Sequence, residues 1–348
     1  MRAPAQRTVG TCAVAVALLS SPSARAAQDD PCQPPSKLSS CIDADNVWPQ
    51  AAGRDWQLIG PTGTAAAGSV AFGLVGSYIL RPIGLRVASA DPDGTVVRVV
   101  DNSVRATLLT ALGVVPRLQV TLALPAILYQ DGAGTGGVVG TPAGLPRSAA
   151  GDLRFGCALS LLGRPAEHDG PALSGRFELG VPSGDAEAFA SAATATFVPG
   201  VSFDYRLGRL GLGADAGARV RGTSELAGAR IGSQLWAALG AGYDLLDRRR
   251  LAVGVEAYAL LGLAAQQHRA RDPLTLAPVE EPSGTLHAPA EWLLSVRSAA
   301  LLGGRLTAAL SGGSFIPTGS ESPVTVPRLR LMAALHYVLD DERSQKTR

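Results

Sequence analysis

Twelve charged residues recur on one face of alternating segments of this sequence, and their chemistry most needs an explanation. Arginine and carboxylate side chains at such positions can line a water-filled passage, bind a solute, or pair with one another across neighbouring strands. Acids and bases nearly balance among them, so the sequence permits each of these arrangements. The twelve are Arg105, Asp152, Arg154, Arg176, Glu178, Asp204, Arg206, Asp215, Arg219, Glu256, Arg297 and Arg330.

Cysteine chemistry concerns a different part of the chain. Cys32 and Cys41 lie close together in a segment rich in proline and serine. In an oxidising compartment this spacing predicts a disulfide, with two free thiols in a mobile leader as the alternative. No further cysteine or histidine lies nearby, so we expect no metal site there. Cys157 falls on an apolar face and is expected to be a small hydrophobic residue facing lipid.

Histidine-based catalysis is weakly supported. The four histidines, His168, His268, His287 and His336, fall in predicted connections or near the end of the last apolar segment. Acyl transfer needs a Ser–His pair, an orienting group and an oxyanion site, and the sequence has no G-x-S-x-G motif. We therefore expect no catalytic residues and no cofactor. A membrane-embedded hydrolase assembled from scattered residues is the remote alternative.

The element that must position the charges is seen best in Arg209–Arg221. Leucine, alanine and valine alternate there, without an error, with glycine, arginine and aspartate. Successive side chains of a β-strand point to opposite faces, so this pattern predicts a strand with one apolar and one small or charged face. The stretch is longer than the ordinary strand of about 5–6 residues. Such strands are typical of a transmembrane β-barrel.

The same alternation recurs often enough to predict a closed, antiparallel, up-and-down barrel of about twelve strands, an all-β fold. Bacterial single-chain barrels have an even number of strands. A division into ten or fourteen strands is also open, because residues 81–114 can be divided otherwise. The twelve segments are 68–80, 98–114, 117–130, 151–162, 171–181, 193–206, 209–221, 230–246, 250–264, 291–302, 305–316 and 327–339.

The connections between these segments alternate between short and long. Links such as Val115-Pro116 and Leu207-Gly208 are tight, whereas 131–150 and 265–290 are long. Outer-membrane barrels have short periplasmic turns and long extracellular loops. This arrangement predicts an outer-membrane location with both termini in the periplasm.

Aromatic residues support two girdles at the membrane interfaces. Near the outer strand ends we place Tyr78, Tyr129, Trp292 and Phe315, and near the inner ends Tyr205, Tyr243 and Tyr337.

Residues 1–26 resemble a secretory signal, with two arginines, an apolar run and the cleavage pattern Ala24-Arg25-Ala26. The predicted organisation continues with a leader at 27–60, the barrel at 61–340 and a short polar tail at 341–348. The leader could be an internal plug, a periplasmic handle or a spacer. Apolar residues make up 46% of the chain and the net charge is +2, without a basic patch, so we expect no nucleic-acid partner.

Several stretches also resemble a known family. Cys41-Ile-Asp-Ala-Asp-Asn-Val-Trp-Pro49, Val70–Tyr78, Asp152–Gly156 and Pro289–Arg297 are among those similar to the amino-terminal barrel region of myxobacterial-type OmpA-family outer-membrane proteins. As partners of such an outer-membrane barrel we expect outer-membrane lipid and the barrel-assembly machinery. In the family a peptidoglycan-binding domain commonly follows the barrel, whereas this sequence ends at Arg348, so peptidoglycan tethering is not carried over.

For function, the sequence favours a passive, weakly selective pore or solute-transfer channel. A ladder of paired charges that closes the lumen would instead make the chain a structural or surface-display barrel, whose extracellular ligand is unknown. The width of a twelve-stranded barrel does not decide between them, because eight strands are just filled by side chains and sixteen leave an open channel.

Overall fold

The computed structural model describes residues 32, 38–53, 55–87, 94–140, 144–164, 168–246, 250–271, 278–282, 287–302, 305–318 and 324–339. The chain divides into two units, Met1–Asp30 and Pro31–Arg348, and every described residue belongs to the second. The predicted signal peptide and polar tail lie outside the described residues.

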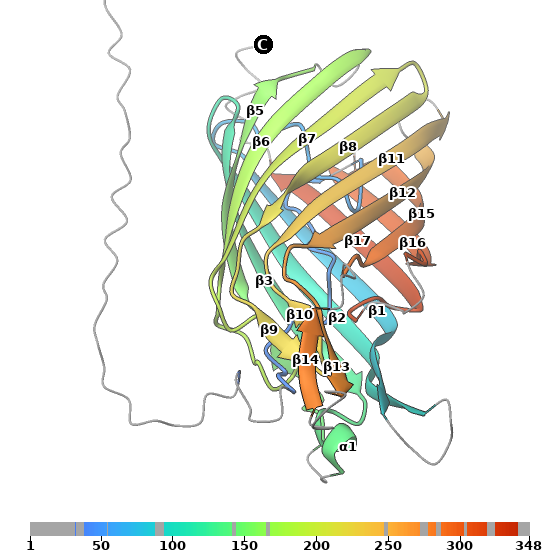
Figure 1. The fold of residues 1–348 in the computed structure, drawn as a ribbon. Helices are drawn as coiled ribbons and strands as arrows, with labels where there is room; N and C mark the ends of the chain where they lie inside the picture. The colour runs from blue at the N-terminus through green and yellow to red at the C-terminus, as the bar shows by residue number, and fades with distance from the viewer. Residues whose placement is uncertain are drawn as a thin grey trace, which may run out of the picture. The chain divides into compact units, whose positions relative to one another are not determined.

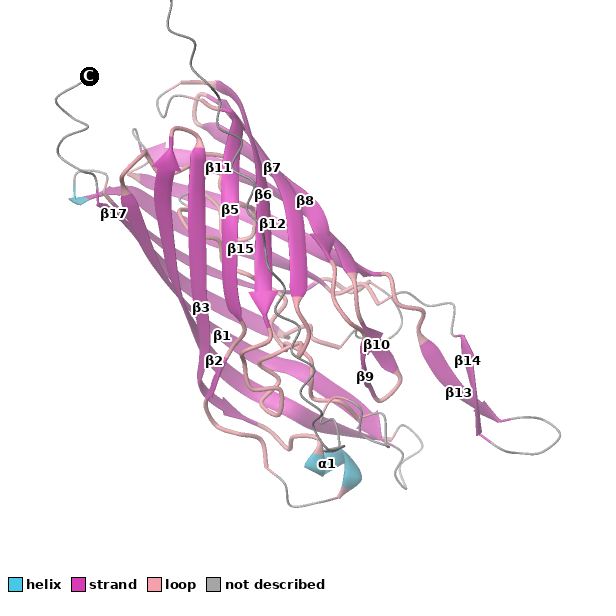
Figure 2. Cartoon of the chain, turned by 90° about the vertical axis from the view of Figure 1, so that its left-hand side faces the viewer, coloured by secondary structure: helices cyan, strands magenta, loops and turns pink. Residues whose placement is uncertain are grey.

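Twelve long strands form one antiparallel sheet that closes on itself (Figures 1 and 2). Closure is made by β1, which pairs with β2 on one side and with the last strand, β17, on the other. The predicted twelve-stranded barrel is confirmed. The strands are β1 (Val70–Val87), β2 (Thr95–Val115), β3 (Leu118–Asp131), β5 (Leu153–Leu162), β6 (Gly170–Val181), β7 (Thr196–Leu207), β8 (Leu210–Arg219), β11 (Gln234–Leu246), β12 (Leu251–Gly262), β15 (Ala290–Leu301), β16 (Leu306–Phe315) and β17 (Leu329–Leu339).

The smaller elements all lie in the long connections. The two-residue strand β4 (Ala149–Ala150) pairs with β3, and the helix α1 (Gly136–Val139) is one turn long. Two hairpins stand apart from the barrel sheet, β9 (Ser224–Leu226) with β10 (Ala229–Ile231) and β13 (Gln267–Arg271) with β14 (Pro278–Pro282). In the described part of the chain, no helix has the length and apolarity needed to cross a membrane; this finding does not bear on β-barrels.

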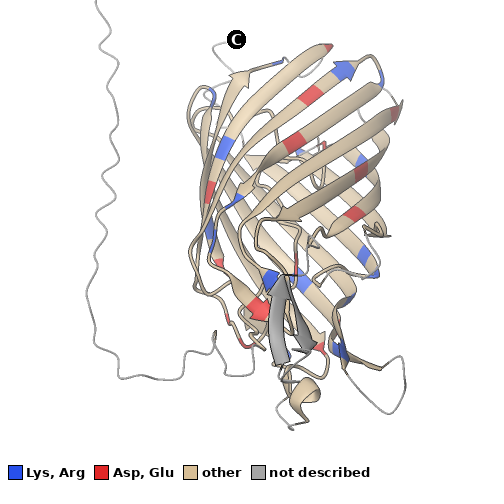
Figure 3. Ribbon diagram, viewed as in Figure 1, with Lys and Arg blue, Asp and Glu red and all other residues tan. Residues whose placement is uncertain are grey.

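The two faces of the wall differ in chemistry as the alternation predicts. Large apolar side chains stand exposed on the outside, for example Leu239 at 68% and Leu310 at 66%. Asp215, Arg219 and Glu256, on the opposite parity, are buried. Charged residues are sparse along the strands (Figure 3). A wall that hides its charges and exposes its leucines is stable only where the outside is apolar, so the outer face is a lipid-facing surface.

The first two strands are longer than the alternation indicates. The sequence places a connection at 81–97, whereas β1 runs to Val87 and β2 begins at Thr95. The register shifts between Leu80 and Ile83, beside Arg81, whose φ is +53°. The inward residues are odd-numbered on both sides of this irregularity, as Ile79, Ile83 and Leu85 show. Arg81 and Pro82 interrupt the apolar alternation instead, which is why the pattern appears to end there. Beyond it, Ile83 and Leu85 are buried against the long loops.

Most of the predicted aromatic girdle lies on the outer parity. Tyr129, Tyr205, Tyr243 and Trp292 are between 37% and 47% exposed, and Tyr78 and Tyr337 lie opposite outward residues, Leu331 and Leu306. Phe315 is a correction: it lies opposite the buried Glu291, so it shares the inward parity. It is five residues from the lipid-facing Leu310, and an odd separation puts two strand residues on opposite faces.

We expect Leu239→Arg to lower the free energy of unfolding by about 2–4 kcal/mol, because it puts a guanidinium on the lipid face at the middle of β11. Leu302, in the turn between β15 and β16, is equally exposed at 69% and is the control. There, Leu302→Arg should cost about 0–1 kcal/mol. Guanidinium chloride titrations of protein refolded into lipid vesicles measure both. Equal losses would contradict the assignment of the membrane span.

Candidate functional site

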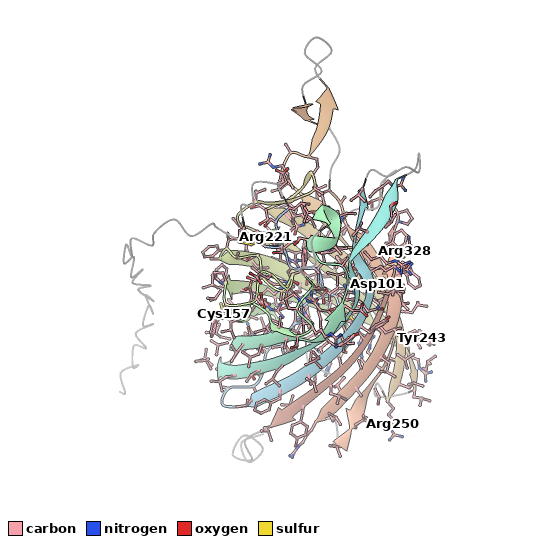
Figure 4. All side chains as sticks on the ribbon, turned by 90° about the horizontal axis from the view of Figure 1, so that it is seen from below. Asp101, Cys157, Arg221, Tyr243, Arg250 and Arg328 are labelled. Carbon is pink, nitrogen blue, oxygen red and sulfur yellow. A yellow bond between two sulfur atoms is a disulfide. The ribbon has the colours of Figure 1, made fainter. Side chains whose placement is uncertain are left out.

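The segment that precedes β1, residues 38–68, runs through the inside of the barrel, and we call it the plug. At one end the amide of Ser39 donates to the carbonyl of Glu225 in β9, among the long loops. At the other end the amide of Gly68 donates to the carbonyl of Gly113, beside the short turn between β2 and β3. The plug therefore spans the lumen from the long-loop end to the short-turn end. Figure 4 shows the space inside the strands crowded with side chains.

Apolar contacts fix the half of the plug that lies nearer the short-turn end. Trp56 and Ile59 are buried and pack against the wall at Gly213 and Gly240, which lie opposite each other on β8 and β11. A Cβ atom at Gly213 would lie 2.8 Å from Cε2 of Trp56, and one at Gly240 would lie 2.8 Å from its Cζ3. Glycine is needed at both positions because the indole ring occupies the space of a side chain. Glycines on the inward face are a sequence signal that could have indicated a bulky occupant of the lumen.

Wall carboxylates bind the backbone of the same half. The Glu256 carboxylate accepts hydrogen bonds from the amides of Gln57 (3.0 Å) and Leu58 (2.8 Å). The Asp215 carboxylate accepts one from the amide of Gly60 (2.6 Å). A plug segment without regular secondary structure thus has its amides satisfied by side chains of the wall, as buried amides require.

The half of the plug nearer the long loops, Asp43–Pro49, is called the upper plug here. It passes four arginines that we call the arginine ring, Arg105, Arg154, Arg219 and Arg330. Arg105 binds the Asp43 carboxylate at 2.7 Å, and Arg330 lies 2.9 Å from that of Asp45. Arg219 donates to the carbonyl of Asn46 (2.7 Å) and Arg154 to that of Pro49 (3.3 Å). The four come from β2, β5, β8 and β17, around much of the wall.

Two members of this ring lie over the indole of Trp48. The guanidinium carbon of Arg219 is 4.6 Å from the ring centroid, and that of Arg154 is 4.8 Å from it. Both distances suit cation–π contacts, which strengthen when water is excluded. The upper plug therefore offers its wall two carboxylates, two carbonyls and one flat aromatic ring.

The other predicted charges also face inward, most of them paired. Arg176 binds Asp215 at 2.7 Å, Arg154 contacts Glu178 at 3.5 Å and Arg206 contacts Asp244 at 3.3 Å. Of the rest, Asp204 accepts from the Trp56 indole and pairs with Arg164, and Arg297 donates to the carbonyl of Asp55 and lies over Trp56.

Asp152 lies in the connection just before β5. It accepts hydrogen bonds from Ser191, Gly184 and Ala192 of the loop after β6. Burial raises the pKa of its carboxyl, although these donors act in the opposite direction. Asp152 therefore holds a loop at the mouth of the lumen.

Outside the plug, the sequence analysis missed three partners of these charges. Glu291 binds Arg330 at 2.7 Å and is fully buried, and Asp244 pairs with Arg206. Both lie an even number of residues from an inward residue of their own strand, a signal that could have identified them. Arg164 lies in a connection, where no periodicity applies.

Two small cavities lie beside the plug. One cavity, bounded by Trp48, Arg176, Arg219, Trp236 and Tyr258 among others, has a water-accessible volume of about 40 Å³. Another, between Asp43, Arg105 and Arg154, has about 30 Å³. Each has room for about two to four water molecules. In this conformation the lumen therefore has no passage for a larger solute along these cavities.

The predicted disulfide is present. Cys32 and Cys41 are bonded, and Cys41 is buried at the long-loop end of the plug. Cys157 is free and exposed on the outer parity of β5. Among the described residues, no group of three or more His, Cys, Asp or Glu could hold a metal ion.

No known protein family and no curated protein matches this sequence. Solved structures match its fold. An outer-membrane channel from Pseudomonas putida F1 superposes with a TM-score of 0.53 at 12% identity, over 80% of this chain and 98% of that chain. A deltaS2 mutant of the TodX monoaromatic hydrocarbon channel gives 0.46 at 12% identity, over 80% and 91%. The NanC porin gives 0.43 at 8% identity, over 76% and 98%.

At 12% identity, the similarity to the Pseudomonas putida channel supports a shared fold and says nothing about a shared substrate. Together with the closed sheet and its apolar outer face, it identifies the chain as an outer-membrane β-barrel protein.

Gly213→Ala should loosen the plug, because a methyl group would overlap the Trp56 ring and cost about 1–3 kcal/mol of overpacking. The control is Gly211→Ala on the same strand and face, where the nearest Trp56 atom would lie 3.8 Å away. Arg54, outside the described residues, supplies a tryptic site in the plug sequence. Trypsin should cleave there several-fold faster in the refolded Gly213→Ala variant. Equal rates in the two variants would contradict the seat assigned to Trp56.

We expect the bond between Cys32 and Cys41 to be quantitative in the mature protein. Closing so short a loop restricts the unfolded chain by roughly 2–3 kcal/mol. Alkylation of denatured protein without reductant should then label Cys157 alone, and mass spectrometry should find two further labels after reduction. Labels on Cys32 and Cys41 before reduction would refute the bridge in solution.

Proposed function

We propose that this protein is a passive outer-membrane channel, closed in the observed conformation by its own plug. The observation that carries the proposal is the nature of the plug's attachment. Among the described residues of the plug, none belongs to the barrel sheet, and the only β contact is an isolated bridge between Leu38 and Leu226. Displacing it would open the lumen and leave the sheet intact.

The upper contacts of the plug are of a kind that water and ions can replace. Guanidinium groups bind the plug's carboxylates and carbonyls at its upper half. Such groups stay hydrated in a polar lumen, so exchange of the plug for solvent leaves none of them stranded in hydrocarbon. The apolar seat of Trp56 opposes this exchange and favours the closed state.

The long loops are proposed to face the outside of the cell, as in other outer-membrane barrels. Leu339 then lies at the periplasmic end and Leu38, beside β9, at the outer end. The prediction that both termini are periplasmic concerns ends that lie outside the described residues. We also propose that residues 1–26 are a signal peptide that is cleaved. We propose further that the barrel is related to the barrel region of the OmpA-family proteins that it resembles.

A permanently closed barrel that displays its loops is the second candidate. It is favoured by the packing of Val47, Trp56 and Ile59 into one apolar cluster with wall residues such as Leu109 and Leu293. A plug fixed in this way would serve as a core. The loop hairpins β9–β10 and β13–β14 would then form the binding surface of the protein.

Planar-bilayer recordings of the refolded full mature chain distinguish these candidates. We expect brief, infrequent openings in the wild type and a higher open probability in Gly213→Ala, because the substitution destabilises only the seated plug. Gly211→Ala should behave as the wild type.

Silence of every form, with the Gly213→Ala plug shown by trypsin to be displaced, would refute the channel and favour the display barrel. Equal open probabilities in the two glycine variants would refute the plug as the gate.

A further inference from the structure

The arginine ring carries more positive charge than its wall neutralises. Two wall carboxylates face its four guanidiniums, Glu178 beside Arg154 and Glu291 beside Arg330. Asp152 and Arg221, both close enough to Asp43 to interact with it, add one charge of each sign. The wall alone therefore has an excess of two positive charges. In the closed state Asp43 and Asp45 of the plug offset this excess.

Arg219 is the member of the ring least satisfied by protein. It is 8% exposed, and in the described part of the chain no carboxylate pairs with it. Its one hydrogen bond goes to a plug carbonyl, and its buried Nε has no partner. The guanidinium borders the cavity shared with Trp48, Trp236 and Tyr258. A buried arginine without a carboxylate partner is costly, so this guanidinium would gain from an anion that entered the adjoining cavity.

The plug also shows which shape the site accepts. The guanidiniums of Arg154 and Arg219 both lie over the Trp48 indole, and two carboxylates lie three and five residues before it. Guanidinium groups bind carboxylates through a planar fork and stack on aromatic faces, so both plug features match the chemistry of the ring. The upper plug thus occupies the ring as a carboxylate and an aromatic ring would.

We propose that the arginine ring is a binding site for solutes that carry a carboxylate beside a planar ring, and that residues 43–49 of the plug occupy it in their absence. This inference rests on the proposed channel for its physiological use, since such a solute must reach the lumen. Binding itself does not require conduction. A solute of this class would compete with the plug and shift the chain towards the open state.

Calorimetric titration of the refolded full mature chain tests the site, with benzoate as the probe and benzamide as its uncharged counterpart. Asp45→Asn weakens the competing plug and leaves the wall unchanged, so it should bind benzoate more tightly than the wild type. Adding Arg219→Gln to Asp45→Asn should weaken benzoate binding by about tenfold or more, because a charge-assisted pair is lost. Benzamide should not bind measurably to any form.

Arg297→Gln, added to Asp45→Asn, is the matched control. Arg297 is as buried as Arg219, at 6%, and also stacks on a plug tryptophan, but it lies outside the ring. It should leave benzoate affinity undiminished. If Arg219→Gln fails to refold, Arg219→Lys keeps the charge, loses the planar fork and should still lower the affinity for benzoate.

Three results would overturn the site: no benzoate binding to Asp45→Asn, equal binding of benzamide, or an equal loss with Arg297→Gln. Any of these three results can occur while Gly213→Ala conducts. The channel proposal would then hold and the binding-site proposal would be refuted. Benzoate binding that depends on Arg219, in protein that never conducts, would refute the channel and keep the site.

Discussion

A β-sheet in hydrocarbon cannot leave an edge unpaired, and the rest of this structure depends on that constraint. Each unpaired amide or carbonyl would cost several kcal/mol, so the sheet closes by pairing β1 with β17. Closure divides every strand into an outward and an inward parity. The outward parity must be apolar, and every charge on a strand within the membrane must turn inward.

Turning charges inward creates a second problem, because the enclosed volume is narrow and poor in water. The wall solves part of it by pairing, as in Arg176 with Asp215 and Arg330 with Glu291. The plug supplies the remainder: its carboxylates and carbonyls satisfy wall arginines, and wall carboxylates satisfy its amides. Wall and plug are thus complementary, and neither is electrostatically complete alone.

Shape complementarity follows the same division. The large indole of the plug residue Trp56 lies where the wall has glycine, at Gly213 and Gly240. Glycine weakens a strand, so its repeated use on the inward face is a cost to the sheet. It is tolerated because the bulky group comes from the other partner. Because these glycines leave no room for a Cβ atom beside the indole, the fit between wall and plug is sensitive to a single methyl group.

The sequence by itself determined the strands, because their period-two alternation is a local property. The bounds of β8 and β17 agree with prediction to within two residues, and the inward parity of residues such as Asp215 and Arg219 follows from the same pattern. Where a charged residue and a proline interrupt the alternation, at Arg81 and Pro82, local reasoning ended the strand too early. At Phe315 it assigned the wrong face.

Only the tertiary structure decided what the inward charges meet. Arg105 and Asp43, or Glu256 and Leu58, are distant in sequence and follow no shared period, since the plug has no regular secondary structure. A leader with little apolar content was compatible with a handle, a spacer or a plug. It became a plug because closure of the sheet produced a lumen whose charges and glycine-lined hollows fit that segment.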